Sequence, residues 1–270
     1  MMTYDMMPGT PRRIRPLGRS ARSGAPRPDI PCYVVGPLCG GLDRLGGLLD
    51  TIGQDIEASG LNRSRIVFLG DLSGGATAQD VMQALAGAEQ ASDGEIVVLM
   101  GDRERALLDF LKSPPAFGPV WLAQGGRAML SAFRISLAAD ITPDALWRAA
   151  AELAAALGPD LVSWLARRPL LWTSGNLVAA HAALDPGLPL RLQSPETVLN
   201  GHARFHTVPR TDGRWVVHGQ PGSAGSVHQH GRIAVGGGLE SQGLVSAARI
   251  VAGDPVRFLF SQHEGMRAAS

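Results

Sequence analysis

Lysine is almost missing from this chain of 270 residues: Lys112 is the only one, and arginine carries nearly all of the positive charge. The 25 basic residues are balanced by 24 acidic residues, which leaves a formal net charge of +1. A molecule so close to neutrality has no overall attraction to nucleic acid or to an anionic membrane. We therefore expect no membrane partner, and no nucleic-acid partner except weakly through a local basic segment.

Cysteine and long apolar runs are scarce as well. The two cysteines, Cys32 and Cys39, are too few and too close in sequence for a disulfide framework. No segment reaches the roughly 18 consecutive apolar residues of a membrane span, and the N-terminal segment lacks the apolar core of a secretory signal. With 45% hydrophobic residues the chain still has enough apolar material for a globular core. These features predict a cytoplasmic protein.

The first 30 residues differ in composition from the rest. They are rich in proline, glycine and serine and contain six arginines between Arg12 and Arg27. Such a stretch buries too little apolar surface to order itself. We predict a basic, flexible tail over residues 1–30, which is either solvated or an arm that touches an acidic partner. The main domain is expected over 31–262, followed by a short tail over 263–270.

Three apolar runs in the first part of the domain indicate parallel strands, at residues 31–36, 65–70 and 95–100. Each is followed by a loop and then by a helical pattern, which begins near Leu42, near Thr77 and at Arg103. Continuous apolar runs that alternate with helices are typical of parallel βαβ units covered on both faces. In open α/β sheets the site lies at the carboxyl ends of such strands.

The second part of the domain begins with a helical insertion at about residues 113–170, after which strand patterns return. These strands are expected at 171–175, 177–182, 214–219, 232–237, 243–250 and 256–261. Their close spacing, without long helices between them, predicts a second, mostly antiparallel sheet.

Five segments, in order, resemble the motifs of calcineurin-type metallophosphoesterases. They are YVVGPLCGGLDRL (33–45), VFLGDLSGGA (67–76), VLMGDRERALLDFL (98–111), VAAHAAL (178–184) and VVHGQP (216–221). The resemblance covers about residues 31–260 and is closest to bacterial serine/threonine phosphoprotein phosphatases and diadenosine tetraphosphatases. It implies an α/β fold: a four-layer α-β-β-α metallophosphoesterase sandwich with two mixed sheets and a helical insertion. In that family two divalent metals activate a water molecule and polarise a phosphate.

At three positions where the family has metal-binding side chains, this chain also has a side chain that can bind a metal. The resemblance assigns them to Asp71, to Asp102 in place of an asparagine, and to His181. Glu104 of the third motif is also retained. Three such ligands can hold one divalent ion. Gln220 or the neighbouring His218 is a possible fourth ligand.

Most other positions with a chemical role are altered. Pro37 and Cys39 replace an aspartate and a histidine that bind the first metal, and a thiolate suits zinc better than manganese or magnesium. Gly74 and Gly75 replace the aspartate that orients the catalytic histidine and a phosphate-binding arginine. Arg103 replaces the catalytic histidine, and Gln220 replaces a ligand histidine. A two-metal site is therefore not expected.

Two alternatives follow for the remaining charges. Either Asp71, Asp102 and His181 hold one divalent metal (manganese, zinc or magnesium), or no metal binds and Arg103 neutralises the carboxylates as an internal counter-ion. Without a cation, two facing carboxylates repel, and one is pushed toward protonation. Arg103 and His202 are the candidate anion-binding residues.

For function, we expect a divergent phosphatase fold that has lost two-metal hydrolysis. Such a pseudophosphatase would act as a binding or regulatory module for a protein or for a phosphorylated or nucleotide ligand. The alternative is a metal-dependent phosphoesterase, for phosphoproteins or dinucleoside polyphosphates, that works with a remodelled single-metal site.

Overall fold

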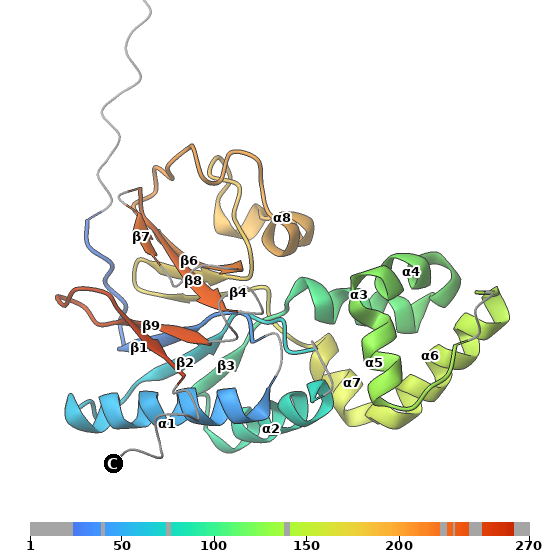
Figure 1. Cartoon of the computed structure of the whole chain (residues 1–270). Helices are drawn as coiled ribbons and strands as arrows, with labels where there is room; N and C mark the ends of the chain where they lie inside the picture. The colour runs from blue at the N-terminus through green and yellow to red at the C-terminus, as the bar shows by residue number, and fades with distance from the viewer. Residues whose placement is uncertain are drawn as a thin grey trace, which may run out of the picture.

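Two sheets lie face to face in the computed structural model, which describes residues 24–38, 41–73, 77–137, 141–221, 226–228, 230–237 and 245–261 (Figure 1). The first sheet has the strand order β10-β9-β1-β2-β3. Its strands are β1 (Cys32–Val35), β2 (Arg65–Phe68), β3 (Ile96–Val98), β9 (Ser246–Ile250) and β10 (Arg257–Phe260). The second sheet has the order β4-β5-β6-β8-β7. It contains β4 (Leu171–Ser174), β5 (Leu177–Ala180), β6 (Trp215–Pro221), β7 (Ser226–His228) and β8 (Arg232–Gly237).

Both sheets are mixed, as the fold prediction required. In the first, β1, β2 and β3 run parallel, whereas β9 and β10 pair antiparallel. The expectation of a mostly antiparallel second sheet is wrong, because β5, β6 and β8 are parallel to one another. The connection between β5 and β6 contains a 3-10 turn and the short helix α8 (Pro195–Asn200), which the spacing of the strands did not reveal. The last two strands, β9 and β10, were expected in the second sheet but belong to the first, where β9 pairs with β1.

Helices cover the outer faces of the two sheets, so that helices and sheets together form four layers (Figure 1). Helices α1 (Leu42–Ala58) and α2 (Ala78–Ala91) lie on the first sheet, and α8 (Pro195–Asn200) lies on the second. The predicted helical insertion is present beside the first sheet. It follows α3 (Asp102–Lys112) and comprises α4 (Pro114–Trp121), a kinked segment (Leu122–Gly126), α5 (Arg127–Ala132), α6 (Pro143–Leu157) and α7 (Pro159–Ala166). A short 3-10 helix spans Leu190–Leu192.

The alternation of side chains along β1 explains why its sequence is apolar throughout. Tyr33 and Val35 pack in the core beneath the helices, whereas Cys32 and Val34 pack in the core between the two sheets. Successive side chains of a strand point to opposite faces, so a central strand of this sandwich has no solvent-facing position. Cys32 is accordingly buried, and burial raises the pKa of its thiol to about 12.

Residues 24–30 lie along the turn between β4 and β5. The Arg27 amide donates to Oδ1 of Asn176 at 2.6 Å, and the Asp29 amide donates to Oγ of Ser174 at 2.9 Å. The Trp215 indole also donates to the Gly24 carbonyl. The other parts of the predicted tails, residues 1–23 and 263–270, lie outside the described residues.

Glu104 joins the loops that follow β2 and β3. Its carboxylate is fully buried and accepts backbone hydrogen bonds from Asp71, Leu72 and Ser73, each at 2.8 Å, and from Gly101 at 3.2 Å. Asp71 has a φ of 58°, in the left-handed region that few residues other than glycine adopt. These hydrogen bonds hold that strained backbone in place.

Two glycines allow the same loops to touch. A Cβ atom on Gly70, whose φ is +97°, would lie 2.5 Å from the Gly101 nitrogen. A Cβ atom on Gly101 would lie 2.4 Å from the Asp71 nitrogen and 2.5 Å from Oε2 of Glu104. Only hydrogen at both positions permits this approach.

We predict that Glu104→Gln lowers the free energy of unfolding by about 2–4 kcal/mol, because its NH₂ group would face backbone donors that lose their acceptor in a buried site. Urea denaturation measures this difference. The control is Glu152→Gln, since Glu152 is exposed on α6, and it should change stability by less than about 0.5 kcal/mol. Equal effects of the two substitutions would contradict the structural role of Glu104.

Candidate functional site

Asp71, Asp102 and His181 meet at one edge of the sandwich. They follow the carboxyl ends of β2, β3 and β5, and each offers a ligand atom within 4.8 Å of the others. Asp71 and His181 are buried, whereas the Asp102 side chain is about half exposed, at 49%. The cluster therefore opens to solvent on the side of Asp102.

The orientation of the His181 ring is fixed by the backbone. Nδ1 lies 2.6 Å from the Leu69 carbonyl oxygen. Since a carbonyl can only accept, Nδ1 carries the hydrogen. Nε2 then faces Oδ1 of Asp71 and Oδ1 of Asp102, each at 3.6 Å. A histidine that ligates a metal is usually held through its other ring nitrogen in this way.

One carboxylate oxygen of Asp71 lacks a hydrogen-bond partner among the described residues. This atom, Oδ1, is buried, and buried polar atoms are rarely left unsatisfied. A cation between Asp71, Asp102 and His181 would satisfy it. Two carboxylates and an imidazole are suitable ligands for zinc or manganese, so these residues could hold one divalent metal ion.

The same groups take up protons when no metal competes. Burial raises the pKa of Asp71 far above its usual range, although the positive charge of His181 opposes the rise. Burial alone would lower the pKa of His181, but the Asp102 and Asp71 carboxylates outweigh it and raise that pKa. Burial opposes ionisation of Asp102 as well, yet its contacts with His181 and Asp71 lower its pKa. A metal ion entering the cluster must therefore displace protons.

Arg103 lies beside the cluster, where the counter-ion interpretation expects it. Its Nε is 3.7 Å from Oδ2 of Asp71, which is an ion-pair distance but too long for a hydrogen bond. The Arg103 side chain is 41% exposed, and ion pairs with such exposure contribute little to stability. The guanidinium thus lies close to the Asp71 carboxylate but makes no hydrogen bond with it.

The altered motif positions differ in what the structure describes. Pro37 is buried, and a Cβ atom on Gly219 would lie 3.0 Å from its Cγ and from the His181 carbonyl oxygen. An apolar ring therefore lies against Gly219, near the backbone of His181. Cys39, Gly74 and Gly75 lie outside the described residues, and so does the side chain of Gln220.

The two remaining histidine candidates face other partners. The His218 ring, considered as a fourth ligand, packs edge-on against Phe205 with centroids 4.8 Å apart and is not part of the three-residue cluster. His202 lies with Nε2 3.5 Å from Oδ2 of Asp185, and Arg204 approaches the same carboxylate at 3.4 Å. The role of His202 in anion binding stays a prediction. Asp185, which the sequence analysis missed, directly follows the VAAHAAL motif.

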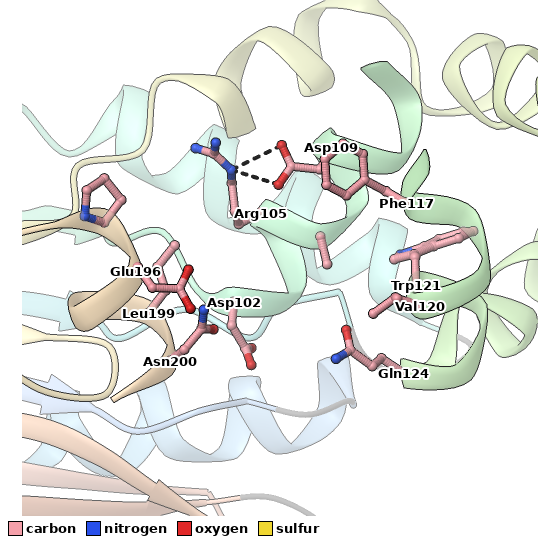
Figure 2. Close-up of a pocket in the computed structure, with 12 residues that line it drawn as sticks. Asp102, Arg105, Asp109, Phe117, Val120, Trp121, Gln124, Glu196, Leu199 and Asn200 are labelled. Atoms are coloured by element: carbon pink, nitrogen blue, oxygen red, sulfur yellow. Dashed lines mark hydrogen bonds and ion pairs between the residues drawn. The ribbon is translucent and has the colours of Figure 1, made fainter. Parts of the chain in front are cut away.

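Two cavities flank Asp102. The first, of about 270 Å³, lies between α3, α4 and α8, and its walls include Arg105, Asp109, Phe117 and Glu196 (Figure 2). The second, of about 500 Å³, is lined by Arg103 and by residues of the helical insertion. Both share Asp102, Ala106, Trp121 and Gln124. The third motif supplies the α3 side of both cavities, whereas the walls from the helical insertion and from α8 lie outside the motifs, so the motif comparison did not indicate them.

We predict that the stability of the metal-free protein falls as pH rises. Asp71 and His181 both have pKa values raised in the folded state, so the folded protein binds more protons than the unfolded chain. Stability from such groups is present at low pH and is lost as pH rises through the folded-state pKa values. Urea denaturation in EDTA should show this fall from about pH 4, where Asp71 ionises in the unfolded chain, up to about pH 9.

Asp71→Asn keeps a neutral group at this position at every pH, so the same titration should be flatter for this variant. The interpretation would be wrong if the wild-type protein became more stable toward pH 9, or if the free energy of unfolding of Asp71→Asn changed with pH as steeply as that of wild type. Either result would show that folding does not raise the pKa values of the cluster.

Within the described part of the chain, the helices are too short or too polar to cross a membrane. No model of a known protein family matches the sequence. No curated protein sequence matches it. Among solved structures the chain is similar to a metallophosphoesterase from Sphaerobacter thermophilus, with 13% sequence identity and a TM-score of 0.49 over 88% of this chain and 90% of the other. The likeness is too distant to support a function, which must come from the site itself.

Proposed function

We propose that this chain is a pseudophosphatase: a protein with a phosphatase-type sandwich that binds a phosphorylated or nucleotide ligand, or a partner protein, without hydrolysing phosphoesters. The observation that carries this proposal is the composition of the cluster. Among the described residues, Asp71, Asp102 and His181 are the one group of three side chains placed to hold a metal. Hydrolysis by a metal pair needs a second ion, and no second set of ligands lies in the described part of the chain.

The packing of Pro37 supports the loss of the second ion. The sequence motif places a metal ligand at this position, but proline has no side-chain donor atom. Its ring is buried against Gly219, close to the His181 carbonyl. A ligand at this point would need both a different residue and the space that the ring occupies.

The protonation chemistry of the family is also missing. Arg103 stands where the motif has the histidine that protonates the leaving group. A guanidinium stays protonated at any relevant pH, so it can bind an anion but cannot act as a general acid. Arg103 therefore favours recognition of an anionic group over cleavage of its ester bond.

A second candidate function, a phosphoesterase with one metal, is favoured by Oδ1 of Asp71. This buried oxygen has no hydrogen-bond partner among the described residues. A divalent ion held by Asp71, Asp102 and His181 would polarise a phosphate oxygen. The general acid would then have to come from a group other than Arg103.

We predict no measurable hydrolysis of p-nitrophenyl phosphate or diadenosine tetraphosphate with manganese present. Loss of a single transition-state donor typically lowers the rate by about 10²–10³, and several groups are absent at once. The Asp71→Asn variant, assayed in parallel, gives the background rate. A turnover near about 1 s⁻¹ that disappears in Asp71→Asn would establish the enzyme instead.

We further predict that the protein binds at most one equivalent of manganese or zinc. Isothermal titration calorimetry or elemental analysis after dialysis gives the stoichiometry. Any binding should be lost in His181→Ala and kept in His202→Ala, since His202 lies beside Asp185 and outside the cluster. Two equivalents lost together in His181→Ala would mean that a metal pair is retained.

A further inference from the structure

The larger cavity beside Asp102 has the size of a small-molecule site. Its volume of about 500 Å³ lies within the range of roughly 300–1,000 Å³ seen for ligand pockets. Asp102 and Arg103 are the charged residues among those that line it. The cavity therefore adjoins the ion cluster directly.

Other walls of this cavity are apolar. They are formed by Ala106 of α3, Trp121 of α4, and Ala128 and Met129 of α5. The kinked segment Leu122–Gly126 adds the amide of Gln124 and the backbone of Gly125 and Gly126. A ligand that covers these walls needs a flat apolar part in addition to its charged group.

The charge distribution decides at which side of Asp102 an anion binds. Arg105, on the smaller cavity, already pairs with both carboxylate oxygens of Asp109, at 3.0 and 3.2 Å. That cavity also contains Glu196 (Figure 2). Arg103, on the larger cavity, makes only the 3.7 Å contact with Asp71 and is 41% exposed. An anionic group is therefore favoured in the larger cavity.

We propose that the larger cavity binds a small organic phosphate monoester with an aromatic group, with the phosphate at Arg103 and the ring against Ala106, Trp121 and Ala128. This inference rests on the proposed function, since it names the ligand class of the same site. A phosphoserine side chain carries only one carbon next to its phosphate, so it would leave the apolar walls uncovered. The chemistry of the cavity thus favours an aromatic phosphate ester over a phosphoserine side chain.

The test compares two probes, inorganic phosphate and 1-naphthyl phosphate, by isothermal titration calorimetry with the full-length protein in manganese-containing buffer. Burial of the naphthyl ring should make the second probe bind at least about tenfold more tightly than the first. Equal affinities, or no binding of either probe, would overturn the proposal.

Two substitutions of exposed alanines locate the ring. Ala128→Trp fills the cavity and should reduce the affinity for 1-naphthyl phosphate to that for inorganic phosphate. Ala123→Trp is the matched control, because Ala123 is exposed on the same helical segment but does not line either cavity beside Asp102. It should leave both affinities unchanged. If Ala128→Trp binds naphthyl phosphate as tightly as wild type, the ring does not occupy this cavity.

A second pair of variants locates the phosphate and does not depend on the folding of Ala128→Trp. Arg103→Gln should weaken both probes by about tenfold or more, because it removes a charge-assisted contact. Arg105→Gln, two residues along the same helix, should leave both affinities unchanged. The reverse pattern would place the anion in the smaller cavity and overturn the assignment.

The same probe separates this inference from the proposed function. Hydrolysis of 1-naphthyl phosphate releases fluorescent 1-naphthol. Release that requires Asp71 would refute the pseudophosphatase proposal, while a tenfold preference for the naphthyl ester would still support the cavity. Absence of both the preference and the release would refute the cavity alone.

Discussion

The hydrogen bonds of the Glu104 carboxylate hold the candidate site together. One buried side chain accepts four backbone amide hydrogens, from the loop after β2 and from the residue before α3. It thereby fixes the left-handed backbone of Asp71 and sets the first turn of α3, which carries Asp102 and Arg103, against it. Its negative charge also contributes to the raised pKa of Asp71. Position and protonation of the cluster thus depend on the same residue.

The residues that shape the site are present in this chain, whereas several positions that carry chemistry in the motifs hold other residues. Gly70 and Gly101 allow the loops to touch, Glu104 joins them, and the Leu69 carbonyl orients His181. All of these work through the backbone. The positions where the motif comparison predicts a second metal or a proton donor hold Pro37 and Arg103, which cannot serve these roles. A cleft of defined shape and charge remains, which is what binding requires.

Local patterns were sufficient to predict the described strands other than β7, and the convergence of the site. The apolar runs located β1, β2 and β3, and residues after the ends of parallel strands were expected to meet, as Asp71 and Asp102 do. Strand direction in the second sheet was predicted wrongly, because β5 and β6 are joined through only the short helix α8 and a 3-10 turn, without the long helix that usually signals a parallel crossover. The partners of Glu104 and the pairing of Asp185 with His202 are contacts between backbone or side chains distant in sequence, which residue patterns do not encode. The walls of the larger cavity depend on how the helical insertion packs, so they too required coordinates.

The contacts of residues 24–30 fix the beginning of the described chain at one edge of the sandwich. Gly24 is held by Trp215 at the beginning of β6, and Arg27 is held by Asn176 just before β5. These are the amino ends of the strands, whereas Asp71, Asp102 and His181 lie at carboxyl ends. Gly24 therefore lies at the edge of the sandwich remote from the cleft. A molecule attached to a support directly at Gly24 would present its cleft to the surrounding solution.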